Sequence, residues 1–338
     1  MKKKVSGLMM FVLLVAVILV GCGEKTQEDI ITDLESKMSE MAGYKSKATM
    51  TLQTGKEPQL YEVEVWHEAE NYYRVALNND NKDQSQIILR NDEGVFVLTP
   101  ALNKSFRFQS DWPKNSSQVY LYESLVHDIL LDPERTFTAT DDHYIFTTNT
   151  NYQNKNLHTQ EVTLNKKDLS PVTVKIMNTD LEVLVQLDFT NFEVDPSFDP
   201  GSFDMNRNMT TAKLNEDLDV NDVEVEPMMV HYPLYTPEGV SVELSEKVQS
   251  DMGERYIIKY AGDKSYTLIQ EQAEVVPAML SMNVQTGMPV DLGYTVGVMT
   301  EESLMWTYNG VDFTLASMDL THDEMVEIAQ SVYGSEEK

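Results

Sequence analysis

The chain of 338 residues contains a single cysteine, and this scarcity excludes several kinds of chemistry. That cysteine is Cys22, so everything after it lacks a disulfide bond, a thiol nucleophile and a thiolate metal site. The folded part must therefore be held together by the burial of apolar side chains. The hydrophobic content of the chain, 41%, is ordinary for a folded protein.

Basic residues are also scarce. The chain has 26 Lys and Arg against 55 Asp and Glu, which gives a formal net charge of −29. Nucleic-acid binding depends on Lys and Arg that neutralise phosphates, so this balance argues against a nucleic-acid partner. The same charge repels anionic lipid headgroups, so any attachment to a membrane must come from something other than charge.

The sequence patterns of common catalytic sites are missing as well. The six histidines include no His-x-x-x-His pair, and there is no phosphate-binding glycine loop and no Gly-x-Ser-x-Gly turn. With so many acidic residues, two carboxylates in one cleft would arise by chance, and an enzyme acting on wall polymers has no more specific support. We therefore expect no catalytic residue, no metal ligand and no cofactor, and the protein is predicted not to be an enzyme.

The N-terminus carries a strong targeting signal. Lys2, Lys3 and Lys4 precede thirteen uninterrupted apolar residues, Leu8 to Val20, a run too short to span a bilayer but typical of a secretory signal. It ends in Leu19-Val20-Gly21-Cys22, which resembles the signal of bacterial lipoproteins. The resemblance implies removal of residues 1–21 and attachment of a diacylglyceryl group, with chains such as palmitate, to Cys22. The mature protein would then be lipid-anchored on the extracytoplasmic face of the bacterial cell membrane.

After a helix expected over residues 24–41, with Thr26 and Asp29 as a capping box, the pattern changes to strands. Eleven candidate strands lie between Ser46 and Val194, separated by short turns. So many consecutive strands predict a strongly curved antiparallel sheet. One helix, expected over residues 118–131, interrupts them, and it places Leu121, Leu125 and Ile129 on one face.

The last third of the chain has a different sequence pattern from the strand-rich region before it. A polar, acidic stretch predicts a linker, and a small domain of mixed strands and helix follows it. Thr321 and Glu324 form a second capping box before the final helix. The predicted organisation is a signal peptide at 1–21, a β domain at 22–205, an acidic linker at 206–227 and a small α+β domain at 228–338.

Residues of about 28–205 resemble the LolA/LolB/RseB family of lipid-handling periplasmic proteins. The likeness rests on Val63-Glu-Val-Trp66, on Asn91-Asp-Glu-Gly-Val-Phe-Val-Leu-Thr-Pro100 and on the paired strands that end in Phe189-Thr-Asn-Phe192. It implies a mainly β fold: an incomplete antiparallel β-barrel wrapped around helices, with an apolar cavity. The whole chain is most similar to a LolA-like sporulation lipoprotein of spore-forming, Bacillus-type bacteria. One departure is Glu68-Ala-Glu-Asn71, where the family often has proline in the turn.

Two functions remain open at this point. In the first, the protein is a carrier or receptor whose cavity binds a lipid or a lipoprotein acyl chain, and the tether at Cys22 favours a receptor over a soluble shuttle. The predicted cavity residues are Val63, Val65, Phe96, Leu98, Phe106, Phe108, Val172, Val174 and Ile176. The predicted lid consists of Leu121, Leu125 and Ile129. In the second, the domain is an RseB-like envelope sensor or protein-interaction module without lipid cargo. Sequence cannot choose, because a cavity and a packed core share one alternating pattern.

Overall fold

The computed structural model describes residues 24–53, 58–69, 71–79, 85–108, 112–113, 117–150, 152, 157–215, 228, 230–250, 253–273, 283–284, 287–292, 295–308 and 310–332. The predicted signal peptide and Cys22 lie outside the described residues. Residues 1–40 form one unit, and residues 41–338 form a second, compact one.

The described part of the first unit is the helix α2 (Gln27–Glu40). Its capping box is present as predicted. The Thr26 backbone N–H donates to Asp29 Oδ2 at 2.9 Å, and the Asp29 backbone N–H donates to Thr26 Oγ1 at 3.2 Å. These two bonds satisfy backbone donors that the first helical turn leaves without intrahelical partners.

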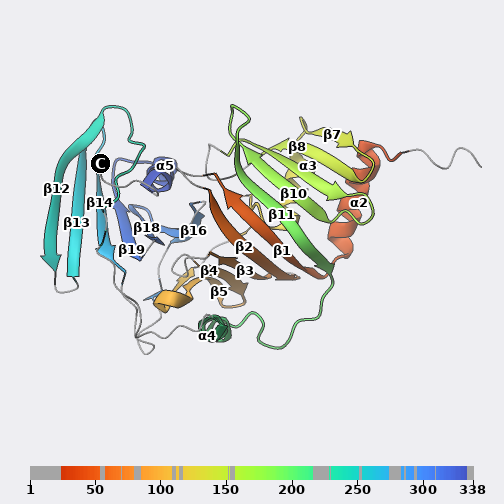
Figure 1. The fold of residues 1–338 in the computed structure, drawn as a ribbon, viewed down its shortest axis with the longest axis horizontal. Helices are drawn as coiled ribbons and strands as arrows, with labels where there is room; N and C mark the ends of the chain where they lie inside the picture. The colour runs from red at the N-terminus through yellow and green to blue at the C-terminus, as the bar shows by residue number, and fades with distance from the viewer. Residues whose placement is uncertain are drawn as a thin grey trace, which may run out of the picture. The chain divides into compact units, whose positions relative to one another are not determined.

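The second unit contains a large sheet built from the eleven predicted strands (Figure 1). They are β1 (Gly43–Leu52), β2 (Gln59–Glu68), β3 (Tyr72–Asn78), β4 (Gln86–Asn91), β5 (Gly94–Thr99), β6 (Lys104–Phe108), β7 (Thr136–Ala139), β8 (His143–Asn149), β9 (Thr159–Asn165), β10 (Pro171–Met177) and β11 (Val183–Val194). All are paired antiparallel, in the order β6-β5-β4-β3-β2-β1-β11-β10-β9-β8-β7. The sheet stays open, with edges at β7 and near β6, so the predicted mainly β, incomplete barrel is confirmed.

A short segment from the last third of the chain extends this sheet. Strand β15 (Asn283–Val284) pairs with Phe106 and Arg107 of β6, and this pairing is parallel. The edge of the large sheet is therefore covered, over two residues, by the C-terminal part of the same chain.

The two faces of the large sheet carry different helices. Along one face the register aligns Val65, Val75, Ile88, Val97 and Phe106 across β2 to β6. Helix α3 (Tyr122–Leu131) lies on this face, because the Tyr44 hydroxyl, which shares the face, accepts a bond from the Tyr122 N–H at 3.1 Å. We call it the α3 face.

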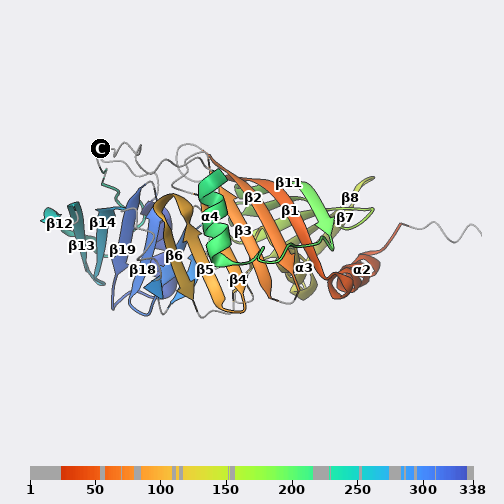
Figure 2. The ribbon, with the colours of Figure 1, turned by 90° about the horizontal axis from the view of Figure 1, so that it is seen from below.

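The opposite face is covered by helix α4 (Met205–Asn215), and we call it the α4 face (Figure 2). Residues 206–215 were predicted to belong to the acidic linker, and this is wrong. Met205 and Met209 are buried in an apolar cluster with Phe96 and Leu98 of β5. The polar sequence hid the helix, because these few apolar residues suffice to fix it to the sheet.

A second antiparallel sheet follows, in the order β12-β13-β14-β19-β18-β17-β16. Its strands are β12 (Val240–Ser250), β13 (Gly253–Gly262), β14 (Tyr266–Gln272), β16 (Met288–Asp291), β17 (Val296–Met299), β18 (Ser303–Tyr308) and β19 (Val311–Ala316). Helix α5 (His322–Val332) packs against β18. Its predicted capping box is present: the Thr321 N–H donates to Glu324 Oε2 at 2.9 Å. Among the described residues, no helix is both long and apolar enough to cross a membrane.

Candidate ligand-binding site

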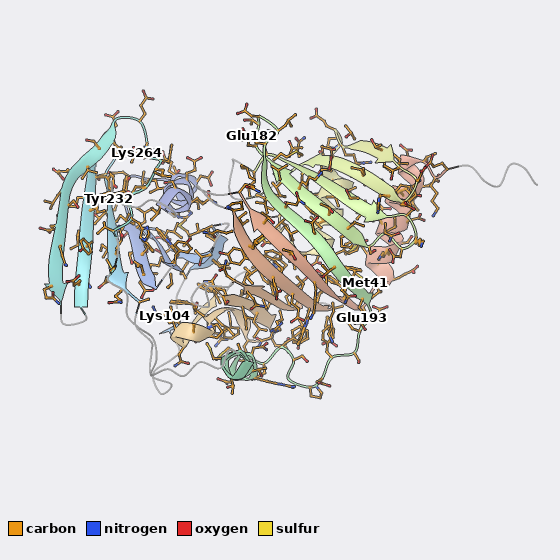
Figure 3. The ribbon with its side chains drawn as sticks, in the orientation of Figure 1. Met41, Lys104, Glu182, Glu193, Tyr232 and Lys264 are labelled. Atoms are coloured by element: carbon orange, nitrogen blue, oxygen red, sulfur yellow. The ribbon has the colours of Figure 1, made fainter. Side chains whose placement is uncertain are left out.

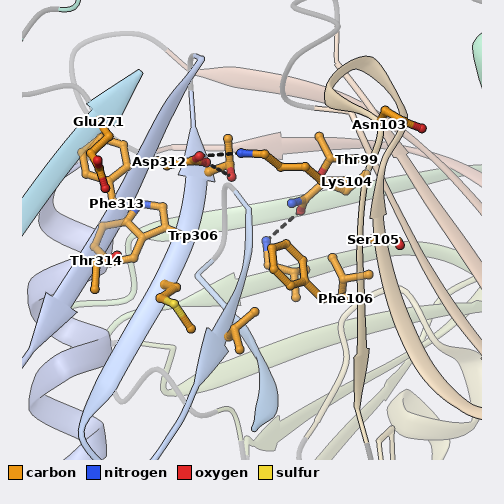
Figure 4. Close-up of a pocket in the computed structure, with 16 residues that line it drawn as sticks. Thr99, Asn103, Lys104, Ser105, Phe106, Glu271, Trp306, Asp312, Phe313 and Thr314 are labelled. Carbon is orange, nitrogen blue, oxygen red and sulfur yellow. Dashed lines mark hydrogen bonds and ion pairs between the residues drawn. The ribbon is translucent and has the colours of Figure 1, made fainter. Parts of the chain in front are cut away.

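A cavity of about 270 Å³ lies where strands β5 and β6 meet the C-terminal sheet (Figure 4). Its lining comes from both sheets: Gln86, Val97, Thr99, Asn103, Lys104, Ser105, Phe106, Glu271, Val296, Val298, Met305, Trp306, Thr307, Asp312, Phe313 and Thr314. Small-molecule sites commonly have volumes of roughly 300–1,000 Å³, and an apolar cavity of about 150 Å³ holds benzene. The space therefore suits a small ligand or one segment of a longer one.

The first wall of the cavity continues the α3 face of the large sheet. Val97 of β5 and Phe106 of β6 are directly opposed and form an apolar row. One step along the same face, Thr99 opposes Lys104, and Gln86 of β4 continues this second row. The wall is thus divided into an apolar row and a polar row.

The second wall, on the C-terminal sheet, shows a matching division. Val298 of β17 opposes Met305 of β18, which in turn opposes Thr314 of β19. In the next row Thr307 opposes Asp312. Each wall therefore has an apolar part and a polar part, and the lining of the cavity is amphipathic.

Polar contacts at the polar end join the two walls (Figure 4), and Lys104, which takes part in them, is labelled in the view of the whole chain (Figure 3). Lys104 Nζ lies 2.5 Å from Asp312 Oδ2, and Thr307 Oγ1 donates to Asp312 Oδ1 at 2.6 Å. The Val296 N–H donates to Gln86 Oε1 at 2.8 Å. These bonds hold the C-terminal sheet against β4 and β6 while leaving the cavity between them.

The predicted cavity residues are distributed over more than one place. Phe106 lines the cavity. Val63, Val65, Phe108, Val174 and Ile176 are buried, and the register places them on the same α3 face. Val172 lies at an irregularity between β10 and β9 and is half-buried.

Phe96 and Leu98 do not belong with that set, and this part of the prediction is corrected. Both point to the α4 face, where they pack with Met205 and Met209. Neighbouring residues of a strand point to opposite faces, so Phe96 and Leu98 cannot share a face with Val97. The sequence misled because both faces of β5 are apolar.

The predicted lid residues Leu121, Leu125 and Ile129 are fully buried in or beside α3. The helix is fastened at its first turn, because the Tyr44 hydroxyl donates to Glu123 Oε2 at 2.7 Å. Burial and the neighbouring Glu123 carboxylate raise the pKa of Tyr44 well above its ordinary value. In this structure α3 is a packed element, and the end of the α3 face beneath it is filled by side chains.

Further along α3, Asp128 accepts hydrogen bonds from Ser117 Oγ at 2.9 Å and from Gln160 Nε2 at 3.1 Å. Burial raises the pKa of this carboxyl, while the two hydrogen bonds act in the opposite direction. The network fixes α3 to β9.

A second hollow, of about 450 Å³, lies beside the chain that leads into α4. Its lining includes five acidic residues, Glu68, Asp92, Glu93, Asp199 and Asp204, and no basic residue. Within the described parts of the chain, no three His, Cys, Asp or Glu side chains are grouped closely enough to hold a metal ion. The hollow is a solvated acidic surface.

Several lining residues of the cavity were missed by sequence reasoning. Gln86, Thr99 and Lys104 belong to strands that were predicted, but only the register shows that they form one row. The opposing wall comes from β17 to β19, some 200 residues later. No local pattern in the sequence predicts a contact between segments so far apart in the chain.

The open antiparallel sheet with helices on its two faces, joined to a second and smaller antiparallel sheet, defines a mainly β protein with an amphipathic cavity between its sheets. The chain belongs to the family of YdcC-like sporulation proteins, whose model matches residues 1–203. Sporulation protein YdcC of Bacillus subtilis (strain 168) is 50% identical over 327 residues, which cover 96% of each chain. Residues 231–332 match a domain of unknown function, DUF4367.

One solved structure with a similar fold is the MucA/MucB complex of Pseudomonas aeruginosa. Its sequence is 13% identical, the TM-score is 0.31, and the alignment covers 88% of this chain and 98% of that one. Another is a putative outer membrane lipoprotein-sorting protein domain from Vibrio parahaemolyticus, at 11% identity and a TM-score of 0.32, covering 53% and 97%. Likeness at this level carries no information on ligands or partners.

Proposed function

We propose that this protein is a membrane-anchored extracytoplasmic lipoprotein that binds a lipid or a lipoprotein acyl chain. The observation that carries the proposal is the cavity between the two sheets, whose apolar row contains Val97, Phe106, Val298 and Met305. Burial of an acyl chain there gains about 0.8 kcal/mol per methylene group without any polar recognition. The protein acts as a binding protein, with no catalytic step.

The anchor is a separate part of the proposal and rests on the sequence around Cys22. Two acyl chains on this residue bind a membrane far more firmly than one chain does. In the native host, Cys22→Ser releases the protein from the membrane fraction or leaves its precursor uncleaved. Unchanged fractionation and processing of this variant refute the anchor.

The ligand is tested by titration of the full chain with a fluorescent acyl probe. Val298→Phe places a ring in the cavity and is expected to lower probe affinity at least tenfold. Val194→Phe makes the same change at an exposed position on β11 and serves as the control. Equal binding by wild type and both variants removes the cavity as the acyl site, and absence of binding by all three removes the carrier function.

The packing beneath α3 favours a second candidate function, an RseB-like sensor that binds a protein partner. Val65, Val174, Leu125 and Ile129 leave almost no exposed surface at that end of the α3 face. Under this alternative, purified protein contains no noncovalently bound lipid, and extraction with organic solvent followed by mass spectrometry finds none. Recovery of a stoichiometric acyl lipid contradicts the alternative and supports the carrier.

A further inference from the structure

The polar row of the cavity contains two buried side chains with unused hydrogen-bonding capacity. Gln86 is 4% exposed and Thr99 is 3% exposed, and both line the cavity. Gln86 uses its carbonyl oxygen to accept the Val296 N–H. Among the described residues, neither the Gln86 side-chain NH₂ nor the Thr99 hydroxyl has a hydrogen-bond partner. Both groups line the cavity, so water can reach them when it is empty. A ligand that displaces this water must offer an acceptor in its place, because a desolvated donor without a partner costs free energy.

These two side chains are close enough to act together. The register pairs Ile87 with Leu98 and Ile88 with Val97, and its continuation by one residue brings Gln86 opposite Thr99. Directly opposed residues in antiparallel strands have Cβ atoms about 4.5–5.5 Å apart. The Gln86 amide and the Thr99 hydroxyl are therefore neighbours on one wall of the cavity.

The charges beside them indicate which oxygen suits the site. Lys104 is paired with Asp312, and Glu271, the other charged lining residue, is paired with Arg255 at 2.6 Å. No lining charge is left without its counterion in the described structure. A carboxylate or a phosphate would bring a negative charge that nothing balances, whereas a neutral carbonyl needs only hydrogen-bond donors.

We infer that Gln86 and Thr99 form a carbonyl-recognition subsite, which takes the ester or amide oxygen of an acyl group while the adjoining methylenes contact Val97, Phe106 and Met305. The inference rests on the proposed function and specifies its chemistry. An alkane fits the apolar row but leaves the polar row unsatisfied. A free fatty acid presents a charge. An acyl ester or amide satisfies both rows.

The test compares three ten-carbon ligands with the full chain: n-decane, methyl decanoate and sodium decanoate. Wild type is expected to bind the ester at least tenfold more tightly than either of the others. Thr99→Val, which keeps the side-chain shape, and Gln86→Glu, which keeps the acceptor for Val296, are expected to reduce ester affinity toward that of decane. Thr148→Val on β8, which removes the hydroxyl of a buried threonine outside the cavity lining, is the matched control.

The outcomes separate the two proposals. Equal affinity for decane and the ester, or tightest binding of decanoate, overturns the carbonyl subsite while leaving an acyl site in place. Failure of all three ligands to bind overturns the proposed function itself. Equal losses of ester and decane affinity in the variants mean that Gln86 and Thr99 support only the fold.

Infrared spectroscopy tests the hydrogen bond to the carbonyl, and a competition experiment identifies where the acyl group comes from. The carbonyl stretch of bound, ¹³C-labelled methyl decanoate should shift to lower frequency in wild type but not in Thr99→Val, since only a hydrogen-bonded carbonyl shifts. An unshifted band in wild type contradicts the inference.

Competition by phosphatidylglycerol vesicles and by a diacylated cysteinyl peptide then distinguishes a membrane lipid from a lipoprotein as the source of the acyl group.

Discussion

Lys104 and Asp312, 208 residues apart in the chain, form an ion pair of 2.5 Å that joins strand β6 of the large sheet to strand β19 of the C-terminal sheet. The Lys104 side chain is 12% exposed and that of Asp312 is 36% exposed. The pair lies at the polar end of the cavity, so the C-terminal sheet is one of the two walls that make the site.

This ion pair should contribute measurably to stability. Lys104→Met or Asp312→Asn is expected to lower the free energy of unfolding by about 1–2 kcal/mol, between the values for exposed ion pairs and for buried charged hydrogen bonds. A double-mutant cycle measured by urea unfolding isolates the coupling. The exposed pair Lys247–Glu254 is the control, with a coupling of at most about 0.5 kcal/mol. Equal coupling in both pairs contradicts the role of Lys104.

The division of β5 between two faces predicts a separation of stability from binding. Leu98→Ala, on the α4 face, should lower the free energy of unfolding by about 2–4 kcal/mol and leave acyl-probe affinity unchanged. Phe106→Ala, in the cavity, should lower probe affinity. Calorimetric unfolding and probe titration of both variants test this, and a loss of affinity in Leu98→Ala equal to that in Phe106→Ala refutes the assignment of faces.

The tyrosines around Glu123 predict a loss of stability at high pH. Burial and the Glu123 carboxylate raise the pKa values of Tyr44 and Tyr73. Above about pH 10 the unfolded chain releases these protons first, so the folded state binds more protons and the free energy of unfolding falls as pH rises. Each buried tyrosine contributes a slope of up to about 1.4 kcal/mol per pH unit.

The check is urea unfolding of wild type and Tyr44→Phe from pH 8 to pH 11. The variant loses its hydrogen bonds to Glu123 and to the Tyr122 N–H and is less stable at pH 8, but its stability declines less steeply above pH 10. Parallel curves for the two proteins would show that Tyr44 does not keep its proton in the folded state.

The cap of α5 gives a prediction for the C-terminal sheet. Thr321→Ala removes the hydroxyl that accepts the Glu324 N–H and should cost about 1 kcal/mol of unfolding free energy. Thr321→Ser keeps the hydroxyl and should restore most of the loss. Thermal unfolding of the two variants tests this prediction. Equal melting temperatures would mean that the Thr321 hydroxyl does not stabilise the protein.

Sequence reasoning reached the local features of this fold because their signals are local. The capping boxes at Thr26 and Thr321, the inserted helix and the eleven strands each depend on residues within a few positions of one another. Helix α4 was missed because its few apolar residues gain stability only by packing on Phe96 and Leu98, more than a hundred residues away.

The candidate site was predictable only in part, for the same reason. Phe106 was included because it lies on an alternating apolar strand. Gln86 and Thr99 carry meaning only through the register of β4 and β5, and the opposing wall depends on contacts such as Lys104–Asp312. The sequence of a strand does not predict which other segment of the chain packs against it.

The most direct test of acyl binding in this cavity is photo-crosslinking with an acyl chain that carries a diazirine near its middle, followed by peptide mass spectrometry. If the acyl chain occupies this cavity, adducts form on the peptides that contain Phe106 and Met305, are reduced by excess unlabelled ester and are absent in Val298→Phe. Adducts confined to other parts of the chain, or labelling that Val298→Phe does not diminish, would contradict it.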